Sequence, residues 1–263
     1  MTALLQQFVS AFTSLAYSAW HLLTFLSSRR SRWRSLRLLA VCRDPFVIER
    51  LPLSRLLPEP FVVSLGPLKS LDHNTSEYEL VCLAALVKVA DATQIFEIGT
   101  YDGRSSRAMA MNLPEHGRLV TLNLPPGQGT NASGERTADS ELNVKVISGR
   151  RFMNTPEAER IVQVFGDSAS FDFRSYEGAM DLVFIDGSHT QTYAENDTEV
   201  ARRLIKPSGG WIVWHDATLY GVAPYLKRQI RQRGWPLRLI DGTTLMVGFC
   251  RGGRLEPVPL ADR

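Results

Sequence analysis

Polar and ionisable side chains recur at the ends of short apolar runs in this chain. Carboxylates bind cations and hydroxyl groups, and an imidazole with an ordinary pKa of about 6.5 removes a proton from a hydroxyl near neutral pH. A single such residue after a strand is usually a loop or helix cap, whereas several in succession are typical of a ligand site. The residues concerned are Glu97, Asn123, Asp167, Ser168, Asp186, His189, His215 and Asp216.

The stretch QIFEIGTYDGRSS, residues 94–106, places one of these carboxylates beside a glycine turn. Gly99 and Gly103 lie four positions apart and permit a tight turn that a ligand can approach closely. The residues that follow favour a helix, whose N-terminal amides accept polar groups. Because the carboxylate of Glu97 repels phosphate and suits hydroxyls and cations, the turn predicts a positively charged nucleoside as its ligand. A structural turn without a ligand is the alternative.

A second group of residues follows two strands that we expect to be neighbours. Asp186 ends one strand, and His215 and Asp216 end the next. Their side chains would converge and hold a hard cation such as Mg²⁺. His189 would stand at the same rim as a general base, and a bound metal would lower the pKa of the substrate hydroxyl. Alternatively, the two aspartates cap helices and the histidines take no part in chemistry.

Strand-like and helix-like segments alternate through most of the chain and must position these groups. Strands are predicted at residues 94–98, 119–124, 161–165, 181–186 and 211–216. Helical segments are predicted at residues 76–92, 104–113, 171–178, 189–205 and 222–233. Such alternation implies right-handed crossovers and a mostly parallel sheet with both faces covered. Ligands of such sheets gather beyond the carboxyl ends of the strands, where the polar residues lie.

Residues 237–241 and 244–249 predict a terminal hairpin that makes one edge of the sheet antiparallel. We therefore expect an α/β fold, Rossmann-like and doubly wound, with a mostly parallel seven-stranded sheet, the antiparallel hairpin and an N-terminal hydrophobic helix. The expected divisions are a hydrophobic helix at 1–28, a basic and Pro-rich connector at 29–75, the folded domain at 76–250 and a tail at 251–263.

The N-terminus carries no charged side chain before residue 29 and is rich in leucine and aromatic residues. Residues 3–26 would cross a bilayer core of about 30 Å as a helix, but their polar side chains also suit an interfacial helix. Five arginines within residues 29–37 follow, so if the segment spans, the positive-inside rule places the domain in the cytoplasm, anchored at the inner face of the membrane. Packing on the domain, packing in a homodimer and a cleavable signal peptide are the alternatives.

Composition indicates which binding partners and which cellular compartment to expect. The net charge of +3 over 263 residues is small, and the basic residues are locally concentrated, which does not favour nucleic acid as a partner. The three cysteines form no CxxC pair, so they indicate neither a disulfide framework nor a zinc knuckle and favour a reducing compartment. Residues 127–141 are almost free of apolar side chains and predict either a lid over the site or a surface insertion.

Five motifs appear in an order that is typical of one family. They are FEIGTYDGRSS (96–106), LNLPP (122–126), FGDSASFDF (165–173), FIDGSH (184–189) and KPSGGWIVWHD (206–216). Together with the terminal hairpin, they resemble the class I S-adenosylmethionine-dependent methyltransferases. The last two resemble, more narrowly, a bacterial branch that includes sugar and macrolide O-methyltransferases, some of them Mg²⁺-dependent. The resemblance covers roughly residues 76–250.

The resemblance implies a role for each motif in binding S-adenosylmethionine. The residues implied at the methionine part of the cofactor are Glu97, Gly99, Thr100 and Gly103. Asn123 would face the ribose hydroxyls, and Asp167 with Ser168 would meet the adenine. Three positions depart from the family pattern. Tyr101 replaces a glycine of the turn, Asn123 replaces an acidic residue, and His215 replaces an acidic metal ligand.

The implied reaction is methyl transfer by in-line displacement to a hydroxyl of a small molecule, a sugar or glycan, or a lipid-linked acceptor. We expect His189 to be the base and Asp186 with Asp216 to hold metal or substrate. A metal-dependent hydrolase that uses the same Asp/His set is one alternative. A nicotinamide oxidoreductase fits less well, because the turn is G-x-x-x-G. A third alternative is a non-catalytic, membrane-tethered binding module, which Tyr101 and Asn123 favour.

Overall fold

The computed structural model describes residues 48–58, 60–69, 74–128, 130, 144, 146–219 and 221–261. The predicted N-terminal helix and most of the predicted lid therefore lie outside the described residues. Among the residues that are described, no helix is both long enough and apolar enough to cross a lipid bilayer. The chain divides into two units, and the larger one, Asp44–Ser70 with Thr75–Arg263, contains every element discussed below.

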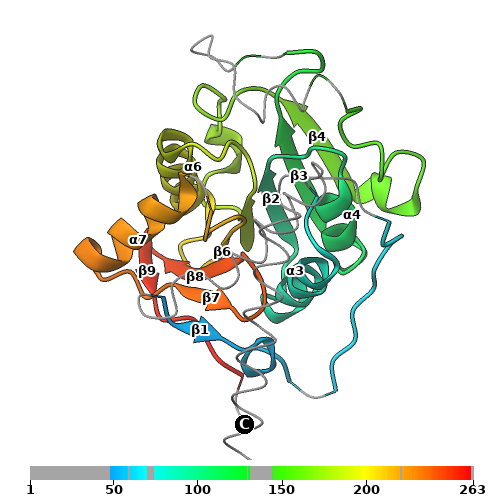
Figure 1. Cartoon of the computed structure of the whole chain (residues 1–263). Coiled ribbons are helices and arrows are strands. Elements are labelled where there is room, and N and C mark those ends of the chain that lie inside the picture. Colours follow the sequence, from blue (N-terminus) through cyan, green and yellow to red (C-terminus); the bar gives the residue numbers. More distant parts are fainter. Residues whose placement is uncertain are drawn as a thin grey trace, which may run out of the picture. The chain divides into compact units, whose positions relative to one another are not determined.

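A nine-stranded sheet forms the centre of the larger unit (Figure 1). The strands are β1 Arg50–Leu51, β2 Gln94–Ile98, β3 Arg118–Asn123, β4 Ile161–Phe165, β5 Leu182–Ile185, β6 Gly210–Trp214, β7 Arg238–Ile240, β8 Met246–Arg251 and β9 Arg254–Glu256. Their order is β1-β7-β8-β6-β5-β2-β3-β4, with β9 paired to β8. The five strands from β6 to β4 are mutually parallel, as expected.

The predicted terminal hairpin is confirmed, because β7 and β8 pair antiparallel. β8 lies between β7 and β6 and is antiparallel to both, and β9 adds a further antiparallel pair. The expected count of seven strands omits β1 and β9, which come from the segments expected as connector and tail. β1 pairs parallel with β7 and extends the sheet at that end.

Four α-helices occur in the part of the chain that the structure describes. They are α3 Glu77–Val89, α4 Arg104–Ala110, α6 Gln191–Leu204 and α7 Val222–Arg233, with short 3₁₀ turns η1 Leu53–Arg55, η2 Pro156–Arg160 and η3 Arg174–Tyr176. Helix α3 begins with a capping box, in which the Ser76 and Glu79 side chains each accept a hydrogen bond from the other residue's backbone amide. Helix α6 begins at Thr190, whose hydroxyl accepts from the amide of Tyr193.

The helical segment predicted at 171–178 is wrong, since only η3 forms there. The rings of Phe171 and Phe173 lie 4.9 Å apart, and Phe173 also lies 5.6 Å from Phe96. Phe173 is buried, and this aromatic packing fixes an irregular backbone that covers the end of the sheet.

Successive side chains of the central strands face opposite sides of the sheet, and each side has its own core. Phe96, Val183 and Trp214 belong to the core that α6 and α7 cover. Ile95 and Phe184 belong to the core that α3 and α4 cover. The sheet is therefore covered on both faces (Figure 1), and its polar residues are left at the carboxyl ends of the strands.

Candidate active site

The glycine turn after β2 lies directly against the end of β5. Gly99 has φ of 102°, and a Cβ placed there would lie 2.0 Å from the carbonyl oxygen of Asp186. Gly103 has φ of 83°, and a Cβ there would lie 2.6 Å from the ring of Phe152. Tyr101 also has a positive φ, 47°. Both glycines are thus required by backbone conformation and by close packing, while Tyr101 occupies the left-handed region with a side chain.

Glu97 lies underneath this turn and is fully buried. One carboxylate oxygen accepts from the hydroxyl of Ser105 at 2.6 Å, and the other accepts from Thr121 at 2.6 Å and from Ser106. Burial raises the pKa of Glu97 to about 7, although these three hydrogen bonds act to lower it. Glu97 therefore ties β2 to β3 and α4 from inside. The arrangement does not offer the direct contact between Glu97 and the cofactor that the family resemblance implies.

Asn123, at the end of β3, also supports the turn. Its side-chain oxygen accepts from the backbone amides of Thr100 at 3.2 Å and Tyr101 at 3.3 Å, and its nitrogen donates to the carbonyl of Leu124 at 3.1 Å. The side-chain hydroxyl of Thr100 pairs with that of Thr121 at 2.7 Å. An amide at position 123 accepts these bonds without placing a negative charge at the turn.

Asp167 and Ser168 form the loop that follows β4. One carboxylate oxygen of Asp167 accepts from the amide of Ala169 at 2.8 Å, and the other accepts from the phenol of Tyr193 at 2.7 Å. The carbonyl of Ser168 accepts from the side-chain amide of Asn196 at 3.1 Å. The loop is therefore held by its own turn and by helix α6, and Asp167 is buried.

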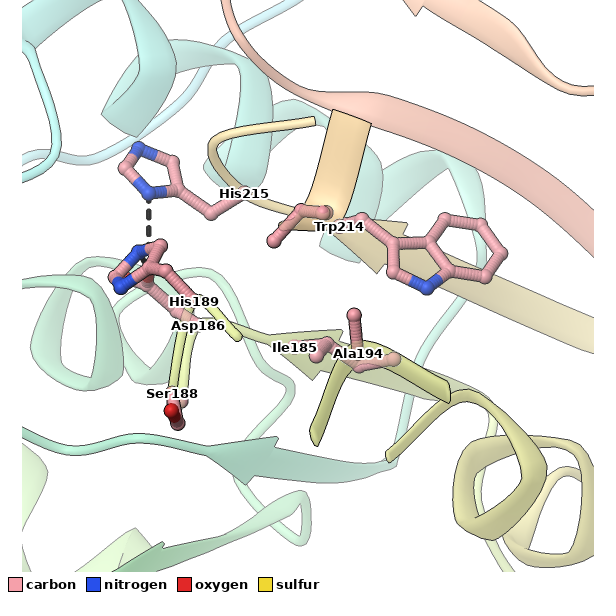
Figure 2. Close-up of a pocket in the computed structure, with 9 residues that line it drawn as sticks. Ile185, Asp186, Ser188, His189, Ala194, Trp214 and His215 are labelled. Atoms are coloured by element: carbon pink, nitrogen blue, oxygen red, sulfur yellow. Dashed lines mark ion pairs between the residues drawn. The ribbon is translucent and has the colours of Figure 1, made fainter. Parts of the chain in front are cut away.

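His189, Asp186, His215 and Asp216 meet beyond the carboxyl ends of β5 and β6. Nε2 of His189 lies 3.1 Å from Oδ2 of Asp216 and 4.0 Å from Oδ1 of Asp186. Nδ1 of His215 lies 2.8 Å from Oδ1 of Asp186 (Figure 2). The His189 side chain remains 24% exposed, whereas those of His215 and Asp216 are each 4% exposed. His189 is thus the imidazole of this cluster that a substrate can reach.

Glu79 of helix α3 completes the cluster, through a contact that the sequence analysis did not predict. Its Oε2 lies 3.4 Å from Nε2 of His215 and accepts from both the amide and the hydroxyl of Ser76. Its Oε1 accepts from the amide of Thr244 at 2.9 Å and from its hydroxyl at 2.7 Å. The S-x-x-E capping pattern is visible in the sequence, but it says nothing of a histidine more than a hundred residues away.

The charges of this cluster shift the pKa values of its members. Burial alone would lower the pKa of His215, but the negative charges of Asp186, Asp216 and Glu79 outweigh burial and hold that pKa well above its usual range. Burial acts to raise the pKa of Asp216, but the charge of His215 and the hydrogen bond from His189 lower it to about 2. His215 is therefore an imidazolium at neutral pH, and Asp216 is a carboxylate.

The set expected to bind Mg²⁺, Asp186, His215 and Asp216, does not fit that ion as it is arranged. Mg²⁺ requires near-octahedral oxygen ligands, and here each carboxylate is directed at an imidazole nitrogen. Ligand atoms of Asp186, His189 and His215 do lie within 4.8 Å of one another. That group offers two imidazoles and one carboxylate, which is not the oxygen-rich ligand set that Mg²⁺ prefers.

A small cavity of about 10 Å³ lies beside these residues, with room for roughly one water molecule. Ile185, Ala194 and Trp214 lie on one side of it, and Asp186, His189 and His215 lie on the other (Figure 2). Val222 also lines the cavity. The glycine turn touches the backbone of Asp186, so the predicted cofactor residues and the predicted base meet at the carboxyl ends of the adjacent strands β2, β5 and β6. Sheets of this type bind their ligands at that edge.

Comparison with known proteins agrees with this arrangement. Residues 96–217 match the model of a family described as a methyltransferase domain. The similarity spans somewhat less than half of the chain, and it agrees with the predicted resemblance to methyltransferases. A search of curated proteins found no match.

Several solved structures are similar to the chain at low identity. An O-methyltransferase from Streptomyces achromogenes involved in tomaymycin synthesis, in complex with SAM, is 19% identical with a TM-score of 0.48, over 84% of this chain and 97% of that one. An O-methyltransferase from Bacillus cereus in complex with SAH is 21% identical with a TM-score of 0.44, over 67% and 82% of the two chains. Similarity at this level does not bear on the acceptor.

Proposed function

We propose that this protein transfers the methyl group of S-adenosylmethionine to a hydroxyl oxygen, with His189 as the general base. The observation that carries the proposal is the pair formed by His189 and Asp216 beside the glycine turn. A base within hydrogen-bond distance of an orienting carboxylate is the arrangement that general-base catalysis requires. The match of residues 96–217 to a methyltransferase domain supports the cofactor.

Cofactor binding in this proposal uses the turn and the two loops beside it. The methionine part lies against the backbone of Gly99, Thr100 and Gly103, and Asn123 faces the ribose hydroxyls. Asp167 and Ser168 meet the adenine. Glu97 acts from below by fixing α4 and β3 rather than by touching the cofactor, since its carboxylate is fully buried.

The proton moves to one defined nitrogen of His189. Because Nε2 donates to Asp216, Nδ1 is the basic atom of that tautomer and accepts the proton of the acceptor hydroxyl. Bound S-adenosylmethionine would supply a methyl group on its sulfonium, and the acceptor oxygen would form its bond to that carbon as the carbon–sulfur bond broke, with S-adenosylhomocysteine as the leaving group. The carboxylate of Asp216 stabilises the imidazolium that forms, and its pKa of about 2 keeps it ionised throughout. His215 and Glu79 hold Asp186 at the same rim.

The acceptor is proposed as a class only. The resemblance of FIDGSH and KPSGGWIVWHD to the sugar and macrolide branch favours a hydroxyl of a small molecule, a sugar or a glycan. A lipid-linked acceptor follows only if residues 3–26 contact a membrane, and that contact, the cytoplasmic location and a homodimer stay predictions. A metal-dependent hydrolase is not favoured, because residues 96–217 match a methyltransferase domain.

The test compares His189→Ala with His116→Ala, which removes an exposed imidazole on the turn before β3. Methyl transfer from labelled S-adenosylmethionine is measured against a panel of polyhydroxylated acceptors, and S-adenosylhomocysteine binding is measured by calorimetry. We expect His189→Ala to lower kcat by about 10²- to 10⁴-fold with little change in binding, and His116→Ala to behave as wild type. Unchanged turnover in His189→Ala would remove it as the base, and failure of the wild type to bind S-adenosylhomocysteine would remove the proposed function.

A further inference from the structure

Helix α6 makes two hydrogen bonds to successive residues of the loop after β4. The phenol of Tyr193 donates to Oδ2 of Asp167 at 2.7 Å. One turn later, the side-chain amide of Asn196 donates to the carbonyl of Ser168 at 3.1 Å. The first bond fixes the carboxylate of Asp167, and the second fixes the backbone beside it.

The same helix is also joined to the loop that carries His189. Thr190, the cap of α6, directly follows His189 and accepts from the amide of Tyr193 at 3.3 Å. Further along, Asp197 is fully buried, and a Cβ placed at Gly187 would lie 3.3 Å from its Oδ2. Asn196 donates to the other oxygen of Asp197 at 2.9 Å. The first two turns of α6 therefore pack against both loops.

We infer that Tyr193 and Asn196 are positioning residues that set the selectivity of the site for adenine. The inference rests on the proposed function, in which Asp167 and Ser168 meet that base. Adenine carries an exocyclic amino group that donates to a carboxylate, and the direction in which Asp167 accepts depends on where its oxygens are held. Without the phenol of Tyr193, Oδ2 of Asp167 loses this donor, and the amide of Ala169 still holds Oδ1.

The chemical consequence is specific to the amino group of the base. A carboxylate held in one orientation favours an amino group over an oxo group at the same position, because two oxygens facing each other repel. Loss of the phenol weakens that preference and leaves the methyl-transfer step at His189 intact. A role limited to stability would instead lower the melting temperature and kcat without changing which base is preferred.

The experiment uses the full chain and compares Tyr193→Phe with Tyr78→Phe, which removes a phenol from an exposed side chain on α3. Calorimetry measures Kd for S-adenosylhomocysteine and for S-inosylhomocysteine, in which an oxo group replaces the amino group. We expect Tyr193→Phe to raise Kd for S-adenosylhomocysteine about fivefold, the effect of losing one hydrogen bond. The ratio of the Kd values for S-inosylhomocysteine and S-adenosylhomocysteine should fall by a similar factor. The KM for S-adenosylmethionine should rise in parallel, with kcat within about twofold of wild type.

A double-mutant cycle with Asp167→Asn isolates the contact. In that background Tyr193→Phe should change Kd by less than about twofold, because the carboxylate that the phenol holds is already gone. Asn196→Ala provides a second variant that should raise Kd without lowering kcat. An unchanged base preference in Tyr193→Phe, with wild type and Tyr78→Phe binding normally, overturns the inference alone. Absence of binding in the wild type overturns the proposed function as well.

Discussion

Asp216 places Oδ2 3.1 Å from Nε2 of His189 although its own backbone lies in the left-handed region, with φ of 48°. Aspartate adopts this conformation more readily than most residues, but still at some cost. Thr244, two residues before β8, holds Asp216 in this conformation. Its hydroxyl, which donates to Glu79, lies 3.3 Å from Oδ1 of Asp216, and its carbonyl accepts from the amide of Ala217 at 3.0 Å. The antiparallel hairpin thus supports the residue that orients the base.

Asp216→Asn should lower kcat by about 10²- to 10⁴-fold, because an amide stabilises the wrong tautomer of His189 and does not balance the imidazolium that forms. Affinity for S-adenosylhomocysteine should stay within about threefold of wild type, as Asp216 lies outside the proposed cofactor loops. Initial rates and calorimetry test this. Asp172→Asn, at an exposed carboxylate paired with Arg174, is the control. A kcat within twofold of wild type would show that His189 does not depend on Asp216.

Replacing Glu79 with Gln should reduce stability by about 2 kcal/mol, because a carboxylate 3.4 Å from His215 is lost while Asp186 stays 2.8 Å from it. The folded pKa of His215 is raised, so its contribution to stability is fully present below about pH 6.5 and is lost as pH rises through the folded pKa. The loss caused by Glu79→Gln should therefore be larger at pH 6 than at strongly alkaline pH. Urea unfolding at both pH values measures this, and an equal loss at each would contradict the charge assignment.

Removal of metal ions should leave methyl transfer unchanged. Asp186 lies against His215 and Asp216 lies against His189, so a divalent cation would have to displace both contacts. Initial rates measured after dialysis against EDTA should agree with those after addition of Mg²⁺ within about twofold. A large loss with EDTA that Mg²⁺ restores would show that the carboxylates bind a metal in the working enzyme.

Asp197→Asn should flatten the pH dependence of stability between pH 5 and 8. Burial raises the pKa of Asp197 to about 7, so the unfolded chain releases this proton above about pH 4 while the folded protein retains it until near pH 7. Stability from this group therefore falls as pH rises through that window, by at most about 4 kcal/mol. Denaturant unfolding at pH 5 and pH 8 measures the difference, and Asp172→Asn again serves as the control. An equal change in stability between pH 5 and pH 8 in the wild type and in Asp197→Asn would contradict the raised pKa of Asp197.

The sequence predicted the central strands well because their hydrophobic runs are bounded by glycine and charged residues. β4 and α7 have the predicted bounds, and β3, β5 and β6 differ by one or two residues at their ends. The strands β1 and β9 were missed because two or three residues show no periodicity. Residues 171–178 were misassigned because aromatic packing there, rather than helical spacing, decides the backbone.

The site was predictable only where its residues end a strand. Asp186, His189 and Asp216 fulfil that rule, because neighbouring parallel strands end at one edge of the sheet. Glu79 and Tyr193 come from helices, and their direction depends on how each helix packs against the sheet. For Glu97, the sequence shows its position in the motif. It does not show that the carboxylate is fully buried and accepts from three hydroxyls.

Gly99 has no side chain, and this constrains how the protein can be engineered. Since even a single methyl group there would collide with the carbonyl of Asp186, the cofactor turn and the loop carrying His189 share one backbone interface. Replacing the loop that carries His189 with that of a relative would shift the glycine turn, and altering the turn would shift His189. A chimeric library that aims to change the acceptor should therefore transplant residues 97–103 and 185–190 as one unit.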